Sequence, residues 1–333
     1  MKKQFYYSAT EIYDRGIFEL LEMGTQFSIK VEADTYYCVV EEDSIFMYKN
    51  ARGFESWLEL IDQEEEVSDL RALELEYMKY GLSLSFAPLE DLGKTEVKEL
   101  KQLEVDYRNM QLIPRFRHHE ELTLPFRIKD IDFMPMDALL ITLSDLIENN
   151  SSLFDDEKMF FEDESDEVEA ELNEMIKTAS ITEDNKVVWG ESELPDIFNR
   201  YPAPSLNERE AYRYRDSKTN GMEWNLHLFI VPNANENNSH IFPIAGALFE
   251  GDERKILGYC LTRDYDQYCE DYLVEILDAI DEFGKPEIIN VSTPRAEALI
   301  EKLCEQLDIQ VQLYSSFEDI DSMEVQLIKN FDY

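Results

Sequence analysis

The sequence predicts an α+β N-terminal domain with an antiparallel sheet and an α/β C-terminal domain with a mixed sheet. The chain has 333 residues, more than one ordinary hydrophobic core needs, which predicts two domains. Runs with the two-residue period of strands alternate with runs of helical period, and an acidic segment separates the two halves. We therefore place an α+β domain at 1–150, an acidic linker and irregular connector at 151–220, and an α/β domain at 221–333.

The first domain is predicted element by element from these periods. Apolar residues at helical spacing predict a helix over 9–23, and alternation predicts a strand over 27–31. Two β-rich runs, 35–40 and 44–48, flank the acidic turn Glu41-Glu42-Asp43 and predict a hairpin. The other elements expected are helices over 53–61, 96–103 and 136–147, a strand over 81–86, and the basic stretch 112–119.

The connector is predicted from its charge and its breaks. Residues 149–177 are almost purely acidic, and like charges at this density resist compaction, which predicts a tether or a solvated helix. A docking segment for a basic partner is the alternative for this run. Residues 186–221 contain several prolines and glycines and are expected to be irregular.

Four arginines form a candidate basic patch. Tyr212-Arg213-Tyr214-Arg215 stands out against the acidic background, and on a strand this alternation would project both arginines from one face. With Arg115 and Arg117, these residues could contact a phosphate or a nucleic acid. The alternative is that they pair with acidic groups of the protein itself.

The C-terminal half predicts three strands, over 223–231, 240–249 and 255–262, with Gly251-Asp252 suited to a tight turn. A helix over 266–283 follows, and Gly284 with Pro286 predicts its end. The remaining elements expected are a strand over 287–291, a helix over 293–307 with Pro294 in its first turn, a strand over 309–313 and a helix over 321–329. The order β-β-β-α-β-α-β-α requires a mixed sheet.

This order, with the phrase GKPEIINVSTP between two helices, resembles the ribonuclease-H-like fold and specifically the integrase and transposase core. The resemblance covers about 110 residues. It implies a mixed sheet on which the nucleases of this fold place two or three carboxylates that hold two divalent metal ions. The resemblance therefore says where catalytic carboxylates would stand in this chain.

Those positions carry a candidate pocket of Trp224, Asn225, His227, Ser292 and Glu324. Trp224 to His227 stand where the first strand would carry an aspartate, and Ser292 or Asn290 stands where the fourth strand would carry the second. Asn225 and Ser292 are neutral and cannot balance two dications, so the resemblance implies a catalytically silent relative. The enzyme alternative is a metal-dependent nuclease or phosphoryl-transfer enzyme with a rearranged site, whose candidate ligands are Glu223, Asp264, Asp266 and Glu324.

The whole chain also resembles an uncharacterised bacterial two-domain family of unknown function. The resemblance rests on an N-terminal domain with a YYC-type strand at 36–38 and its hairpin, followed by the C-terminal domain after an acidic connector. It implies the bacterial cytoplasm and brings no activity with it.

The net charge bounds the partners. Asp and Glu total 73 against 31 Lys and Arg, which gives −42 at pH 7. Such a chain repels nucleic-acid phosphates and anionic membranes at long range. We expect a non-catalytic interaction module with a protein partner, a basic one being the option that charge favours. Mimicry of a nucleic acid toward a basic protein is a further alternative.

Metal and cofactor motifs find no support in the sequence. Cys38, Cys260, Cys269 and Cys304 form no CxxC pair, and no glycine-rich phosphate loop or GxSxG elbow occurs, so we expect no metal and no cofactor. Adjacent His118 and His119 should diverge on a strand rather than share a metal. No apolar run approaches a membrane span, and the N-terminus lacks a secretory signal, so we expect a cytoplasmic protein.

Overall fold

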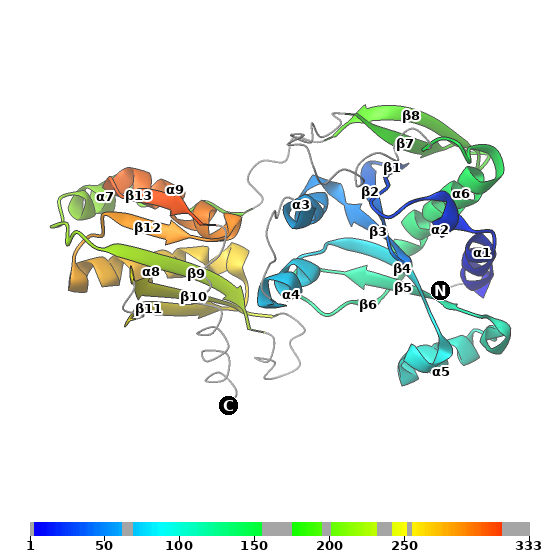
Figure 1. Ribbon diagram of the computed structural model, residues 1–333, viewed down its shortest axis with the longest axis horizontal. Helices are drawn as coiled ribbons and strands as arrows, with labels where there is room; N and C mark the ends of the chain where they lie inside the picture. Colours follow the sequence, from blue (N-terminus) through cyan, green and yellow to red (C-terminus); the bar gives the residue numbers. More distant parts are fainter. Residues whose placement is uncertain are drawn as a thin grey trace, which may run out of the picture. The chain divides into compact units, whose positions relative to one another are not determined.

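The computed structural model describes residues 3–61, 69–154, 175–194, 201–231, 242–251 and 255–314 (Figure 1). The chain forms two compact units. Unit 1 comprises Met1–Trp57, Lys79–Glu120 and Pro125–Asp196, and unit 2 comprises Leu58–Met78, Glu121–Leu124 and Ile197–Tyr333. The segments of the two units interleave along the chain, whereas the division at residues 150 and 220 stays a prediction.

Unit 1 contains an eight-stranded sheet in the order β6-β5-β4-β3-β2-β1-β7-β8. All neighbouring strands run antiparallel except β1 and β7, which are parallel. The predicted antiparallel sheet is thus confirmed with one parallel pair. Its strands are β1 (Gln26–Val31), β2 (Asp34–Glu41), β3 (Ser44–Lys49), β4 (Gly81–Ala87), β5 (Ile113–His119), β6 (Phe126–Arg127), β7 (Met175–Ile181) and β8 (Val187–Glu193).

Helices bury both faces of this sheet because apolar side chains project alternately from one face and the other along its strands. Cys38 and Val40 of β2 share a core with α1 (Lys3–Asp14) and α6 (Phe133–Asn149). Tyr37 points the other way and stacks on Phe54 of α3 (Asn50–Ile61), with ring centroids 5.1 Å apart. The remaining helices of unit 1 are α2 (Ile17–Leu20), α5 (Lys94–Gln102) and the short 3-10 turns η1 (Leu89–Asp91), η2 (Tyr107–Asn109) and η3 (Asp130–Asp132).

The predicted helix over 9–23 is wrong in its extent. Helix α1 ends at Asp14, and α2 begins at Ile17. Between them Gly16 has a φ of 78°, which glycine adopts without the strain that a Cβ would cause.

The predicted irregular connector contains regular elements. Strands β7 and β8 pair antiparallel over seven residue positions, and α7 (Glu208–Arg215) is a helix. Residues 212–215 are therefore helical, and the predicted strand alternation is wrong. Asn207 caps α7 by accepting a hydrogen bond from the backbone of Glu210, while Arg213 and Arg215 lie in the last turn, where the helix dipole favours cations. Most of the predicted acidic tether lies outside the described residues.

Unit 2 contains a five-stranded sheet in the order β11-β10-β9-β12-β13. Strands β9, β10 and β11 form an antiparallel meander, and β12 runs parallel to both β9 and β13. These strands are β9 (Glu223–Ile230), β10 (Ile244–Glu250), β11 (Lys255–Thr262), β12 (Ile288–Val291) and β13 (Gln310–Leu313). The mixed sheet is confirmed, and the predicted last helix over 321–329 lies outside the described residues.

Helix α7 packs into the core of unit 2 together with α4 (Asp69–Tyr77), α8 (Tyr265–Phe283) and α9 (Pro294–Leu307). Every second residue of β9, beginning with Trp224 and Leu226, joins this core. Gly284 ends α8 with a φ of 90°, as predicted. No helix in the described part of the chain is both long and apolar enough to cross a bilayer.

Candidate functional site

Two polar pairs lie side by side where β9 and β12 run parallel. The register places Asn225 opposite Asn290, and Asn290 donates from Nδ2 to Asn225 Oδ1 at 2.8 Å. Two residues beyond each asparagine, Ser292 Oγ lies 3.4 Å from His227 Nδ1. The structure thus brings Asn225, His227 and Ser292 to one strip of the sheet.

Two of the four side chains of this strip are buried, the other two are half-buried, and none of the four carries a fixed negative charge. Asn290 is 5% exposed and His227 8% exposed. Asn290 Oδ1 finds no hydrogen-bond donor among the described residues. Trp224 lies in the core of unit 2, because alternation along β9 turns it away from Asn225. The groups that meet here are two amides, a hydroxyl and an imidazole, which can hydrogen-bond but supply no anionic ligand.

The alternative metal ligands are spread apart or engaged elsewhere. Asp264 caps α8 by accepting a hydrogen bond from the backbone of Gln267 at 3.1 Å. Glu223 is exposed at the start of β9, and Asp266 is exposed in the first turn of α8. Glu324 lies outside the described residues. Across the described ranges, no group of three His, Cys, Asp or Glu side chains is placed to hold a metal ion.

The four candidate arginines divide between the units. Arg115 and Arg117 in unit 1 both contact Glu96 Oε1, at 3.0 and 2.5 Å. In unit 2, Arg213 forms an ion pair with Asp281 at 2.9 Å, and Arg215 donates from Nε to a backbone carbonyl at 2.8 Å. Each pair therefore has its own partners within its own unit.

The adjacent histidines have different surroundings. His118 Nδ1 lies 2.9 Å from Asp132 Oδ2, and this hydrogen bond lowers the pKa of Asp132 although burial works in the opposite direction. His119 Nε2 lies 2.9 Å from Ser83 Oγ. Burial, aided by the charge of Lys79, lowers the pKa of His119 to about 3. The two rings diverge, and each belongs to a separate hydrogen-bonded pair.

Helix α8 presents an acidic face that the sequence reasoning did not single out. The helix carries seven carboxylates and no lysine or arginine: Asp266, Glu270, Asp271, Glu275, Asp278, Asp281 and Glu282. We call this set the acidic face of α8. The signal was present in the sequence, since these residues fill the polar positions between the apolar residues of the predicted helix.

The acidic face changes the titration of its neighbours. Cys260 on β11 has its pKa raised to about 11, first by burial and then by the charges of Asp271 and Glu275. The pKa of Tyr214 on α7 is also raised, by burial and by its hydrogen bond to Asp281. Burial is the first cause of both pKa shifts, and the negative charge of the α8 carboxylates raises the two pKa values further.

Two family models match the chain. The model described as Domain of unknown function (DUF7309) matches residues 3–170, and the model described as Domain of unknown function (DUF6930) matches residues 211–328. The first match covers just over half of the 333 residues. No curated protein matches the chain. Two domains of unknown function were expected and are found, while the bacterial origin stays a prediction.

Solved structures similar to the chain include integrase catalytic cores and an intasome. They include the HTLV-2 integrase catalytic core domain in complex with magnesium in its dimeric form, with 14% identity, 32% of this chain, 67% of that chain and a TM-score of 0.25. The trimeric form of the same domain is 13% identical, covers 33% of this chain and 70% of its own chain, and gives a TM-score of 0.26. Another is the simian T-cell lymphotropic virus intasome in complex with PP2A regulatory subunit B56 gamma. It is 16% identical, the match covers 36% of this chain and 44% of that chain, and the TM-score is 0.26. At these TM-scores the similarity supports no inference about activity.

Proposed function

The chain belongs to the family described as Domain of unknown function (DUF7309), which brings no activity with it, and we propose from its residues that unit 2 is a non-catalytic interaction module. In this proposal the acidic face of α8 binds a basic segment of a protein partner. The proposed fold of unit 2 is ribonuclease-H-like. Its support is the meander β9–β11, followed by β12 and β13 parallel to β9, with α8 and α9 as crossovers.

The polar strip on β9 and β12 supports the non-catalytic part of the proposal. Magnesium and manganese ions are held in proteins chiefly by carboxylates, carbonyls and water, and a two-metal site needs negative charge to hold both ions. Asn225 and Asn290 supply uncharged amides where the two parallel strands meet, and Asn290 donates a hydrogen bond to Asn225. Two divalent metal ions would therefore bind only weakly at this strip.

The acidic face of α8 is the observation that carries the interaction part. Carboxylates four positions apart repel each other, and three such pairs follow one another: Asp266 with Glu270, Asp271 with Glu275, and Asp278 with Glu282. The last turn carries Asp281 and Glu282, where the helix dipole disfavours anions. The sequence thus holds a charge pattern that costs stability, which is the expectation for a functional surface rather than a structural one.

The length of the helix sets the size of the binding segment. At 19 residues α8 is roughly 28 Å long. An extended peptide of about nine residues spans the same distance. Asp271, Asp278 and Glu282 are exposed on this face and have no ion-pair partner among the described residues. Lysine and arginine side chains would neutralise these carboxylates directly.

The first experiment titrates the full chain with a Lys/Arg-rich peptide of about nine residues, using calorimetry at low and at moderate salt. A peptide of the same length with neutral glutamines is the control. We expect binding of the basic peptide that weakens as salt rises, and no binding of the neutral peptide. Equal heats from both peptides would contradict the proposal. If a DNA duplex takes the peptide from the chain without binding the chain itself, the result would support the alternative that the acidic surface mimics a nucleic acid.

The second experiment separates the module from a metal-dependent enzyme. Manganese is titrated into the full chain and into its Glu324→Gln variant. We expect no saturable binding tighter than about 1 mM in either protein. If the unaltered chain binds manganese tightly and the Glu324→Gln variant does not, the non-catalytic proposal would give way to that of a hydrolytic enzyme.

A further inference from the structure

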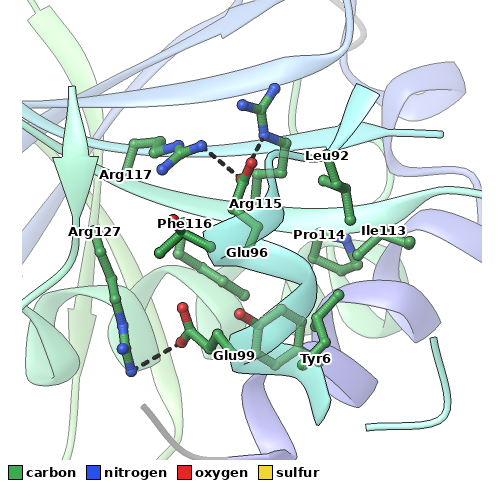
Figure 2. A pocket seen from close by; sticks show the side chains of 12 residues that line it. Tyr6, Leu92, Glu96, Glu99, Ile113, Pro114, Arg115, Phe116, Arg117 and Arg127 are labelled. Atoms are coloured by element: carbon green, nitrogen blue, oxygen red, sulfur yellow. Dashed lines mark hydrogen bonds and ion pairs between the residues drawn. The ribbon is translucent and has the colours of Figure 1, made fainter. Parts of the chain in front are cut away.

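Unit 1 contains a cavity of about 150 Å³ between α5 and β5 (Figure 2). One part of its wall is apolar, with the rings of Tyr6 and Phe116 and the side chain of Leu100. The other part is charged, and its five ionisable side chains are Glu96, Glu99, Arg115, Arg117 and Arg127. Three arginines thus face two glutamates in a chain whose net charge is −42.

Glu96 is shared by two guanidinium groups. Its Oε1 atom lies 3.0 Å from Arg115 Nε and 2.5 Å from Arg117 Nη2 (Figure 2). Its Oε2 atom accepts a hydrogen bond from the backbone of Gly93 at 2.8 Å and so caps α5. Among the described residues, this is the one ion-pair contact of each guanidinium. One carboxylate charge therefore balances two cations, and several N–H donors of each arginine remain for another acceptor.

Glu99 and Arg127 form the second charged group of the cavity wall. Glu99 is 8% exposed, and its Oε1 atom lies 2.9 Å from Arg127 Nη2. This contact lacks hydrogen-bonding geometry, and Oε1 has no hydrogen-bond donor among the described residues. Burial raises the pKa of Glu99 and, with the charge of Glu99, that of Tyr6. Glu99 thus balances the charge of Arg127.

We propose that this cavity binds a small organic carboxylate, whose anionic group is held by Arg115 and Arg117 and whose apolar body lies against Tyr6 and Phe116. A cavity of about 150 Å³ can hold a ligand of the size of benzene, and its lining includes both cationic and apolar side chains. Glu96 already shows that both guanidiniums can donate hydrogen bonds to one carboxylate oxygen. A second monoanion would balance the charge that Glu96 leaves uncompensated, in the charge-assisted geometry that guanidinium groups favour.

The test measures binding of benzoate and of inorganic phosphate to the full chain by calorimetry. We expect benzoate to bind with a Kd of about 1 mM or lower and phosphate to bind more weakly. The double variant Arg115→Gln/Arg117→Gln should weaken benzoate binding by roughly tenfold or more. The matched control Arg213→Gln/Arg215→Gln removes the same charge from α7 in unit 2 and should leave benzoate binding unchanged.

A third variant decides the question even if the double variant fails to fold. Glu96→Gln retains an amide oxygen that can still cap α5, but it frees both guanidiniums from their internal carboxylate. Benzoate binding should then strengthen by roughly threefold or more. The proposal is overturned if Glu96→Gln leaves the affinity unchanged or if the α7 control weakens binding as much as the cavity variant. Phosphate binding tighter than benzoate binding would overturn the assignment of a carboxylate.

Discussion

Glu74 and Arg295, which stand 221 residues apart in the sequence, form a buried ion pair inside unit 2. The side chain of each is 2% exposed. The guanidinium of Arg295 also lies 5.0 Å from the ring centroid of Tyr201 and 5.5 Å from that of Tyr265. Burial alone would lower the pKa of Arg295, but the charge of Glu74 raises it above its ordinary value. This pair ties α4 to α9.

Glu74→Gln should therefore destabilise unit 2. The substitution leaves a buried guanidinium without its counter-charge, which typically costs about 3–5 kcal/mol of unfolding free energy. Urea unfolding followed by tryptophan fluorescence measures the effect, in a background in which Trp57 and Trp189 are replaced by Phe so that the buried Trp224 alone reports. The double variant Glu74→Leu/Arg295→Met removes both charges and should recover part of the loss. A change below about 0.5 kcal/mol in the single variant would show that the pair carries no stability.

Removing charge from the acidic face of α8 should stabilise the protein. Asp278→Asn/Glu282→Gln removes one like-charge pair and an unfavourable anion near the C-terminal end of the helix, which together are worth about 0.5–1.5 kcal/mol at low salt. Thermal unfolding should show a higher Tm, and added salt should reduce the gain. Glu297→Gln is the contrast, since Glu297 lies in the first turn of α9, where the dipole favours an anion, and its loss should lower the Tm. A lower Tm for the α8 variant would contradict the described repulsion.

The thiol of Cys260 reports the same negative potential. Its pKa is raised to about 11, so little thiolate exists near neutral pH and alkylation should be slow. Asp271→Asn/Glu275→Gln removes the two charges that contribute to this shift, which lowers the pKa and raises the thiolate fraction. Iodoacetamide labelling followed by mass spectrometry of the peptide that contains Cys260 should show a faster rate in the variant. Cys304, which is buried at 1% exposure, serves as the internal control and should not react faster.

Unit 1 should lose stability in mild acid because of His119. In the folded state its pKa is about 3, against an ordinary value of 6.5, so only the unfolded chain takes up a proton between these values. The free energy of unfolding should fall as the pH drops below about 6.5, by up to about 1.4 kcal/mol per pH unit. His119→Gln can keep the hydrogen bond to Ser83 without titrating and should show a shallower decline. Parallel pH profiles for the two proteins would contradict the low pKa.

Local signals sufficed where neighbouring residues decide the structure. The hairpin of β2 and β3 follows from two alternating runs around Glu41-Glu42-Asp43, and the end of α8 follows from Gly284. The Asn225–Asn290 contact became predictable only through the resemblance, because strand order fixes which parallel strands are neighbours. Elements governed by caps were missed: the alternation at 212–215 suggested a strand, but the Asn207 cap and the basic last turn favour a helix.

Long-range pairing could not be predicted from the sequence. Nothing near Glu74 indicates that its partner is Arg295, so the membership of α4 in unit 2 was not foreseen. The cavity of unit 1 depends on β6, a strand of two residues, to bring Arg127 to Glu99. Such a short strand has no period to detect. The basic character of Arg115 and Arg117 was visible, whereas their shared carboxylate, Glu96, belongs to another element.

If the acidic face of α8 binds a basic segment, two charge-matched variants of the chain should differ in their affinity for it. One is Asp271→Asn/Asp278→Asn/Glu282→Gln on α8, and the other replaces Glu297, Glu301 and Glu305 on α9 by Gln. Fluorescence anisotropy of a labelled Lys/Arg-rich peptide measures the affinity of each full-length protein. We expect the α8 variant to bind roughly tenfold more weakly and the α9 variant to bind about as tightly as the unaltered chain. Equal affinities of the two variants would show that attraction depends on net charge alone and that α8 is not the binding surface.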